Sequence, residues 1–194
     1  MNNRTLGTLG IACAPFLLLA SAVSSPSSQW QNPILGATWE IFYLIGWMCS
    51  MVGLYRIEAT GRGRLGKGLL LLHLFTLTLA TFFSLYSALD PKANTPLFWV
   101  LDAFWPISNG LMLVVGLAVV VQAKLRGWQR YVPLAVGLWL PFALGALAVL
   151  SWAPEAQLLG GLYSAIAWSL LGFVVRSSEE ESVYPVRGVL VSRG

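Results

Sequence analysis

The sequence predicts an all-α integral membrane protein, a bundle of six transmembrane helices with both termini in the cytoplasm. Three observations support this fold class. Hydrophobic residues make up 57% of the 194 residues and charged residues only 10%, whereas a soluble domain is nearer a quarter charged. The apolar residues gather in runs of about 20, the length that crosses a bilayer. Eleven of the twelve Lys and Arg residues fall at the N-terminus, in alternate breaks between these runs, or in the C-terminal tail.

Six apolar segments are long enough, or nearly so, to span a membrane, and together they form one transmembrane domain over residues 1–175. The segments cover approximately residues 6–23, 34–55, 69–89, 97–121, 131–152 and 158–175. Short breaks after the third and fifth segments favour antiparallel hairpins. Residues 176–194 are expected to form a cytoplasmic tail, in which the acidic run 179–181 is either a solvated charge run or an interaction site.

The first segment has two interpretations. Arg4, the apolar run after it and the small residues 20–22 resemble a cleavable signal peptide. The length of the run, and the span that follows it, favour a permanent helix. Cleavage of residues 1–22 would leave five helices without changing the orientation of the others.

The positions of Lys and Arg predict the orientation, because cytoplasmic loops carry the excess of these residues. With the N-terminus in the cytoplasm, Lys92 is the one basic residue on the outer side. The cytoplasmic set is Arg4, Arg56, Arg62, Arg64, Lys67, Lys124, Arg126, Arg130, Arg176, Arg187 and Arg193. The mean hydropathy of +0.71 and this topology place the protein in a cell membrane. Its general character is that of small bacterial multi-pass proteins, which points to the inner membrane.

Glu40 is an acid inside the second segment, roughly 9–10 Å below the outer boundary at 1.5 Å per residue. At the 100° step of an α-helix it shares one face with Gly36, Tyr43, Trp47 and Ser50. Because lipid offers no hydrogen bonds, this face is expected to point toward protein or water.

Asp102 lies at matching depth in the fourth segment, on one face with Trp105, Pro106 and Asn109. Pro106 lacks the N–H that would bond the carbonyl of Asp102, which predicts a kink beside residues 108–110. The sequence therefore predicts an outward-opening polar pocket between the second and fourth helices. Its candidate ligand- or proton-binding residues are Glu40, Tyr43, Trp47, Asp102, Trp105 and Asn109. The alternative is a purely structural role for the two acids.

His73 is the one histidine of the chain and is expected near the cytoplasmic end of the third segment, away from the acids. Its face continues through Thr76, Ala80, Ser84 and Ser87. A packed, hydrogen-bonded imidazole is expected, with a pH-sensitive role as the alternative, because the reference pKa is about 6.5. No cofactor or metal is predicted, since a haem or zinc centre needs ligands that the chain lacks.

Three classes of function stay open. The first is transport or sensing of a small molecule or ion through the polar pocket. The second is an accessory, assembly or scaffold protein that docks another copy or another membrane protein through small-residue faces, such as those with Gly145 and Gly161. An enzyme is not favoured, because the P-loop, HExxH and GxSxG motifs are missing from the sequence. Nucleic-acid binding is not expected, since the basic residues lie in short loops between spans.

Overall fold

The computed structural model describes residues 1–24, 32–150 and 154–183, and within these ranges the chain is helical with no strand. The helices are α1 (Asn3–Cys13), α2 (Phe16–Ser24), α3 (Pro33–Arg56), α4 (Arg64–Leu89), α5 (Pro96–Asp102), α6 (Phe104–Gln122), the 3-10 helix η1 (Gly127–Tyr131), α7 (Val132–Gly137), α8 (Trp139–Val149) and α9 (Pro154–Val183). Five segments of the described chain are long and apolar enough to cross a membrane, and the bent pair formed by η1–α7 and α8 makes a sixth. The predicted all-α multi-pass fold is confirmed.

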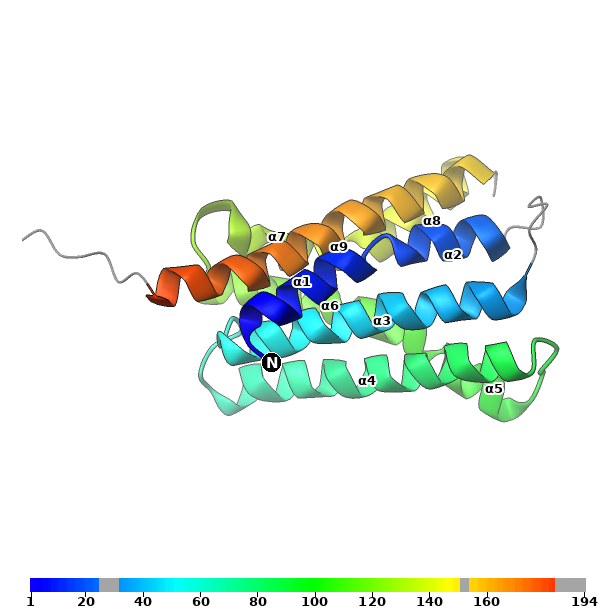
Figure 1. Ribbon diagram of the computed structural model, residues 1–194, viewed down its shortest axis with the longest axis horizontal. Coiled ribbons are helices and arrows are strands. Elements are labelled where there is room, and N and C mark those ends of the chain that lie inside the picture. Colours follow the sequence, from blue (N-terminus) through cyan, green and yellow to red (C-terminus); the bar gives the residue numbers. More distant parts are fainter. Residues whose placement is uncertain (25–31, 151–153, 184–194) are drawn as a thin grey trace, which may run out of the picture.

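The helices run side by side along the long axis of the molecule (Figure 1), and their contacts form a closed ring. α1 and α2 pack between α9 and α3, α3 packs against α4, α4 against α6, and α6 against α7. α7 and α8 return to α9 and complete the ring. α3 also contacts α9 across the ring, where buried side chains such as Trp47 and Trp168 fill the centre. The core therefore runs along the axis of the bundle, and the outer faces of the helices meet the surroundings.

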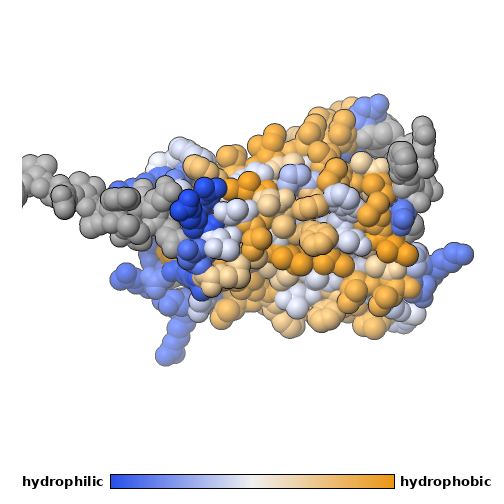
Figure 2. All heavy atoms as spheres, viewed as in Figure 1, coloured by the Kyte–Doolittle hydropathy of each residue, from blue (hydrophilic) through white to orange (hydrophobic). Residues whose placement is uncertain are grey.

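The surface of the bundle is apolar over its middle. Figure 2 shows hydrophobic side chains covering the central part of the visible face and hydrophilic ones gathered at the two ends. Large apolar side chains including Phe75, Phe82 and Ile166 are more than half exposed. A soluble protein rarely exposes a contiguous apolar surface of this kind, whereas a bilayer solvates it. The protein is a multi-pass membrane protein.

Basic residues collect at one end of the bundle, on the left in Figure 1, and we call it the basic end. It contains the start of α1, the α3–α4 connection, the α6–η1 connection and the last turns of α9. Its described basic residues are Arg4, Arg56, Arg62, Arg64, Lys67, Lys124, Arg126, Arg130 and Arg176. The chain thus enters the first span and leaves the last at the same end, which requires an even number of crossings. Six crossings satisfy this condition.

Three of the predicted spans are each interrupted by a turn. The first segment is divided into α1 and α2, the fourth is divided at Ala103, and the fifth bends by 51° at Leu138. The last two breaks lie three residues before Pro106 and Pro141. A proline ring clashes with the carbonyl four residues earlier, so the turn before the proline is distorted. α6 continues through residues 108–110, beside which a kink is expected, and the interruption at Ala103 lies five to seven residues earlier.

α9 is longer than the segment 158–175 expected from hydropathy, because it continues to Val183. Its last turns have partners in the bundle: a Cβ on Gly7 would strike the backbone of Arg176, and Ser177 Oγ accepts a hydrogen bond of 3.4 Å from Gln129 Nε2. The first part of the predicted tail is therefore helical. Residues 184–194 lie outside the described residues.

Candidate functional site

The face of α3 that the sequence predicts to point toward protein or water does point into the bundle. The helix begins after Asn32, whose side-chain oxygen accepts a hydrogen bond of 3.0 Å from the N–H of Leu35. Along the predicted face Gly36, Tyr43, Trp47 and Ser50 are buried, and Glu40 is half-buried. One ionisable side chain is thus held at the inner surface of α3, toward the end of the bundle opposite the basic end.

Glu40 lies between two other polar groups. The hydroxyl of Ser84, on α4, donates a hydrogen bond of 3.1 Å to Glu40 Oε2. Asp102, the last residue of α5, is half-buried and close enough to interact electrostatically with Glu40. Neither carboxylate forms an ion pair within the described part of the chain. Two like charges in a poorly solvated place repel each other, which raises the free energy of the state in which both are ionised.

The other candidate residues of the fourth segment lie on α6, beyond the turn residue Ala103 that separates it from α5. Trp105 packs edge-on against Trp139 of α8 at 5.4 Å between ring centroids. Pro106 is exposed, and Asn109 is buried with its amide donating to the carbonyl of Trp105 at 3.0 Å. The Asn109 donor is therefore bonded to its own helix rather than to the acid pair.

His73 lies within three turns of the start of α4, and its side chain points into the core of the bundle. It is fully buried, and its ring meets Trp47 edge-on at 5.3 Å between centroids. Neither ring nitrogen has a hydrogen-bond partner among the described residues, although a hydrogen-bonded imidazole is what the sequence predicts. The stripe of Thr76, Ala80 and Ser84 that continues its face is buried, as expected of a packing surface.

Two residues of α9 complete this centre, and the sequence patterns do not assign them to a site. Trp168 meets Trp47 at 4.9 Å and Tyr43 at 5.5 Å between ring centroids. Ser164 lies one turn before Trp168, and its hydroxyl interacts with that of Tyr43 without meeting hydrogen-bond geometry. The spacing of four residues places both side chains on one face of α9, which is the only sequence signal for their role.

We call Tyr43, Trp47, His73, Ser164 and Trp168 the central polar cluster. Each is at most 2% exposed. Six of their polar atoms have no hydrogen-bond partner in the described structure: Tyr43 Oη, Trp47 Nε1, both His73 ring nitrogens, Ser164 Oγ and Trp168 Nε1. Leaving one buried polar group without a partner costs about 1–3 kcal/mol. Six such atoms would together cost on the order of 10 kcal/mol, which is comparable to the whole stability of a typical domain.

An apolar pocket of about 220 Å³ lies between α2, α8 and α9. Its lining residues are Leu17, Ser21, Trp139, Ala143, Leu147, Ala156, Gln157, Gly160 and Gly161. Trp139 forms the wall toward the bundle centre: its indole N–H donates to the carbonyl of Gly160 at 2.8 Å, and its ring contacts Trp168. The pocket and the central polar cluster are therefore separated by one aromatic side chain.

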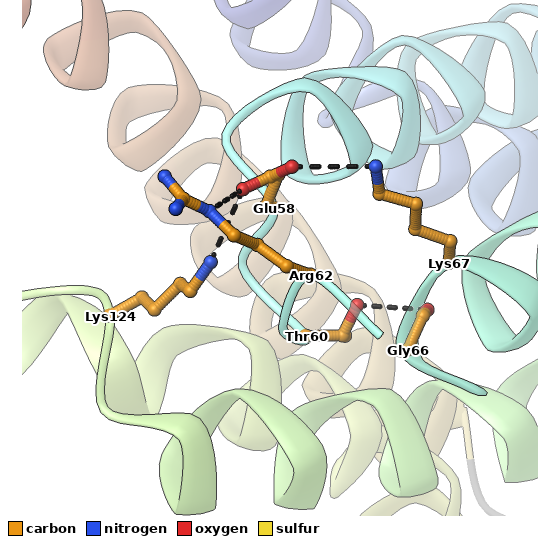
Figure 3. Close-up of polar contacts among 6 residues, drawn as sticks. All are labelled: Glu58, Thr60, Arg62, Gly66, Lys67 and Lys124. Atoms are coloured by element: carbon orange, nitrogen blue, oxygen red, sulfur yellow. Dashed lines mark hydrogen bonds and ion pairs between the residues drawn. The ribbon is translucent and has the colours of Figure 1, made fainter. Parts of the chain in front are cut away.

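A polar network at the basic end is shown in Figure 3. The carboxylate of Glu58 lies 2.8 Å from Arg62 Nε and 3.4 Å from the Nζ atoms of Lys67 and Lys124. The hydrogen bond from Arg62, supported by the two lysines, lowers the pKa of Glu58 from its ordinary 4.5 to about 2. Because Lys124 follows α6 and the other three residues belong to the α3–α4 region, this network ties the ends of three helices together.

The chain matches no known protein family, no curated protein and no solved structure. Within the described residues, no group of three or more His, Cys, Asp or Glu side chains is placed to hold a metal ion. Cys13 and Cys49 are free thiols. Function must therefore be argued from the acid pair, the central polar cluster and the surfaces described above.

Proposed function

We propose that the protein binds a proton or a small cation between Glu40 and Asp102 and transports or senses it across the membrane. One observation carries this proposal: two carboxylates from different helices interact in the same half of the bundle, and neither has a basic partner in the described chain. Ionisable groups at membrane depth are costly, and they are kept where an ion or proton must bind.

The surroundings of Glu40 favour a cation over an anion or an apolar molecule. Carboxylate and hydroxyl oxygens are the ligands that hard cations prefer, and Ser84 adds a hydroxyl to the pair. The candidate ligand-binding residues Tyr43 and Trp47 continue on the same face of α3 toward the bundle centre. Trp105 and Asn109, on α6, are proposed as structural neighbours of the site rather than as ligands, because both are engaged with helix α8 or with their own helix.

Thermal unfolding of the purified protein tests cation binding. The melting temperature should be measured in one detergent with Na⁺, K⁺, Ca²⁺ or choline chloride at equal ionic strength, and between pH 5 and 8. A cation present at about 100 times its Kd stabilises the folded state by roughly 2.7 kcal/mol, which corresponds to several degrees. The wild type is expected to respond to one of these cations or to pH. Glu40→Gln and Asp102→Asn should each abolish the response.

Asp90→Asn is the matched control, since Asp90 is an exposed acid at the end of α4, on the same side of the bundle. This variant should retain the full response. Proteoliposomes containing a pH-sensitive dye or a Na⁺ indicator then separate transport from sensing. Equal responses of the wild type and the Glu40→Gln/Asp102→Asn double variant would rule out the acid pair as the site.

An accessory or assembly role is the second candidate, and the exposed side of α8 favours it. Gly145 is exposed, and a Cβ built on it meets nothing within 4 Å, so this helix offers a small-residue surface to another helix. Gentle solubilisation of native membranes distinguishes the two functions. A stoichiometric membrane-protein partner that is lost in Gly145→Leu supports the accessory role, and a stable monomer argues against it.

A further inference from the structure

The most unusual feature of the interior is that the central polar cluster has polar atoms without protein partners. We infer that the cluster encloses bound water, which supplies the hydrogen bonds that Tyr43, Trp47, His73, Ser164 and Trp168 do not receive from the protein. This inference does not depend on the proposed function, because it concerns α3, α4 and α9 deeper in the bundle than the acid pair.

The five side chains form one continuous group. Trp47 contacts Tyr43, His73 and Trp168 at 5.9, 5.3 and 4.9 Å between ring centroids. The hydroxyl of Ser164 interacts with that of Tyr43. The five side chains therefore belong to one buried region, and each of their six polar atoms lacks a protein partner there. Buried polar groups that lack protein partners are commonly bridged by internal water, which makes two to four hydrogen bonds.

The balance of donors and acceptors favours water over an ion. Two indole N–H groups can only donate, the two hydroxyls donate and accept, and a neutral imidazole does one of each. The cluster thus offers five donors and, with two lone pairs on each hydroxyl oxygen, five acceptors, and a water molecule, which donates twice and accepts twice, can bond groups of both kinds. The cluster contains no charged side chain, and an ion without a counter-charge would pay a large desolvation cost there.

Bound water at this depth would extend the polar interior from the acid pair to the middle of the membrane. Tyr43 lies one turn from Glu40 on the buried face of α3, and Trp47 lies one turn further. Polar groups therefore continue along α3 from Glu40 to the contact with His73 on α4. Water in the cluster would make this row of groups a hydrated path along the two turns of α3 from Glu40 to Trp47.

Removing single hydroxyls tests the inference. A buried hydroxyl bonded to water stabilises the protein, whereas one without any partner destabilises it. The two cases therefore predict changes of opposite sign in the melting temperature. Tyr43→Phe and Ser164→Ala each remove one oxygen and leave the packing nearly unchanged. If water bonds these hydroxyls, each variant should lower the melting temperature by about 2–4 °C. Tyr163→Phe is the matched control, since the Tyr163 hydroxyl donates to the carbonyl of Ala135 at 2.7 Å, and it should show a similar loss. A rise in melting temperature for Tyr43→Phe or Ser164→Ala would overturn the inference.

The double variant Tyr43→Phe/Ser164→Ala tests the alternative that the two hydroxyls are buried next to each other without bound water. Water bonding predicts that the double variant is less stable than either single one, whereas recovery of the wild-type melting temperature would contradict the inference.

NMR of ¹⁵N-tryptophan-labelled protein detects water beside the two indoles directly. The indole N–H signals of residues 47 and 168, assigned through Trp47→Phe and Trp168→Phe, should show cross-relaxation with water. Absence of this cross-relaxation would refute the inference, and so would a shift of both indole signals that depends on chloride concentration.

Discussion

Replacing Gly172 by alanine should weaken the bundle, because this glycine lies where α9 and α1 touch backbone to backbone. A Cβ at Gly172 would lie 2.7 Å from the carbonyl oxygen of Gly7 and 2.7 Å from the amide nitrogen of Ile11. Ordinary contact of a Cβ begins at 3.4 Å, so the two helices would have to separate by roughly 0.7 Å. Neither contact atom belongs to a flexible side chain, and the strain cannot be relieved by a rotamer change.

The size of the effect follows from two opposing contributions. Inserting a methyl group into a closely packed interface costs about 1–3 kcal/mol. Alanine in a helix interior is better than glycine by about 1 kcal/mol, which partly offsets this cost. Gly145→Ala in α8 isolates the second contribution, because a Cβ there meets nothing within 4 Å. The difference between the two variants is therefore the packing cost alone, and at 2–4 °C for each kcal/mol it is about 6 °C at the centre of the range.

Thermal unfolding followed by circular dichroism at 222 nm, in one detergent and at one scan rate, measures this difference. Gly145→Ala should melt at or slightly above the wild-type temperature, and Gly172→Ala clearly below it. If Gly172→Ala melts as high as Gly145→Ala, then α1 and α9 do not pack as closely as described. That result would also remove the reason for placing the first segment inside the bundle.

Three further predictions concern other parts of the structure. The lowered pKa of Glu58 means that its ion pairs stabilise the folded state fully above about pH 4.5 and lose this effect as the pH falls toward 2. The melting temperature of the wild type should fall across this window more steeply than that of Glu58→Gln. Trp139→Phe removes the hydrogen bond to the Gly160 carbonyl and should lower the free energy of unfolding by about 1–2 kcal/mol in chemical denaturation, whereas an unchanged value would show that this bond is not formed. Protein isolated from its native membrane should retain residues 1–22 in its intact mass, because α1 covers Gly172, and a mass that lacks them would support a signal peptide.

The sequence predicts the spans well, because their signal is local. A run of about 20 apolar residues and the placement of Lys and Arg are read without knowing which helix touches which. The buried face of α3 is predictable for a similar reason: Glu40, Tyr43 and Trp47 recur at the period of one helix. The hydrogen bond from Ser84 to Glu40 is predictable only in part. The sequence pattern places Ser84 on a packing face, but it does not indicate which residue Ser84 contacts.

What the sequence does not reveal depends on contacts between distant segments. Trp168 contacts Trp47 because α9 and α3 touch in the centre of the bundle. The sequence of either segment alone does not predict this contact. The contact of His73 with Trp47 is not visible in the sequence for the same reason, because it joins α4 to α3. The continuation of α9 past residue 175 likewise depends on its contact with α1 rather than on hydropathy.

Asp102 and Glu40 belong to helices that both pack against α4. Because Pro106 cannot donate to the carbonyl of Asp102, the helix breaks at Ala103, and α5 becomes a separate short helix packed on α4. α4 also provides the hydroxyl that bonds Glu40. The same helix therefore supports both carboxylates.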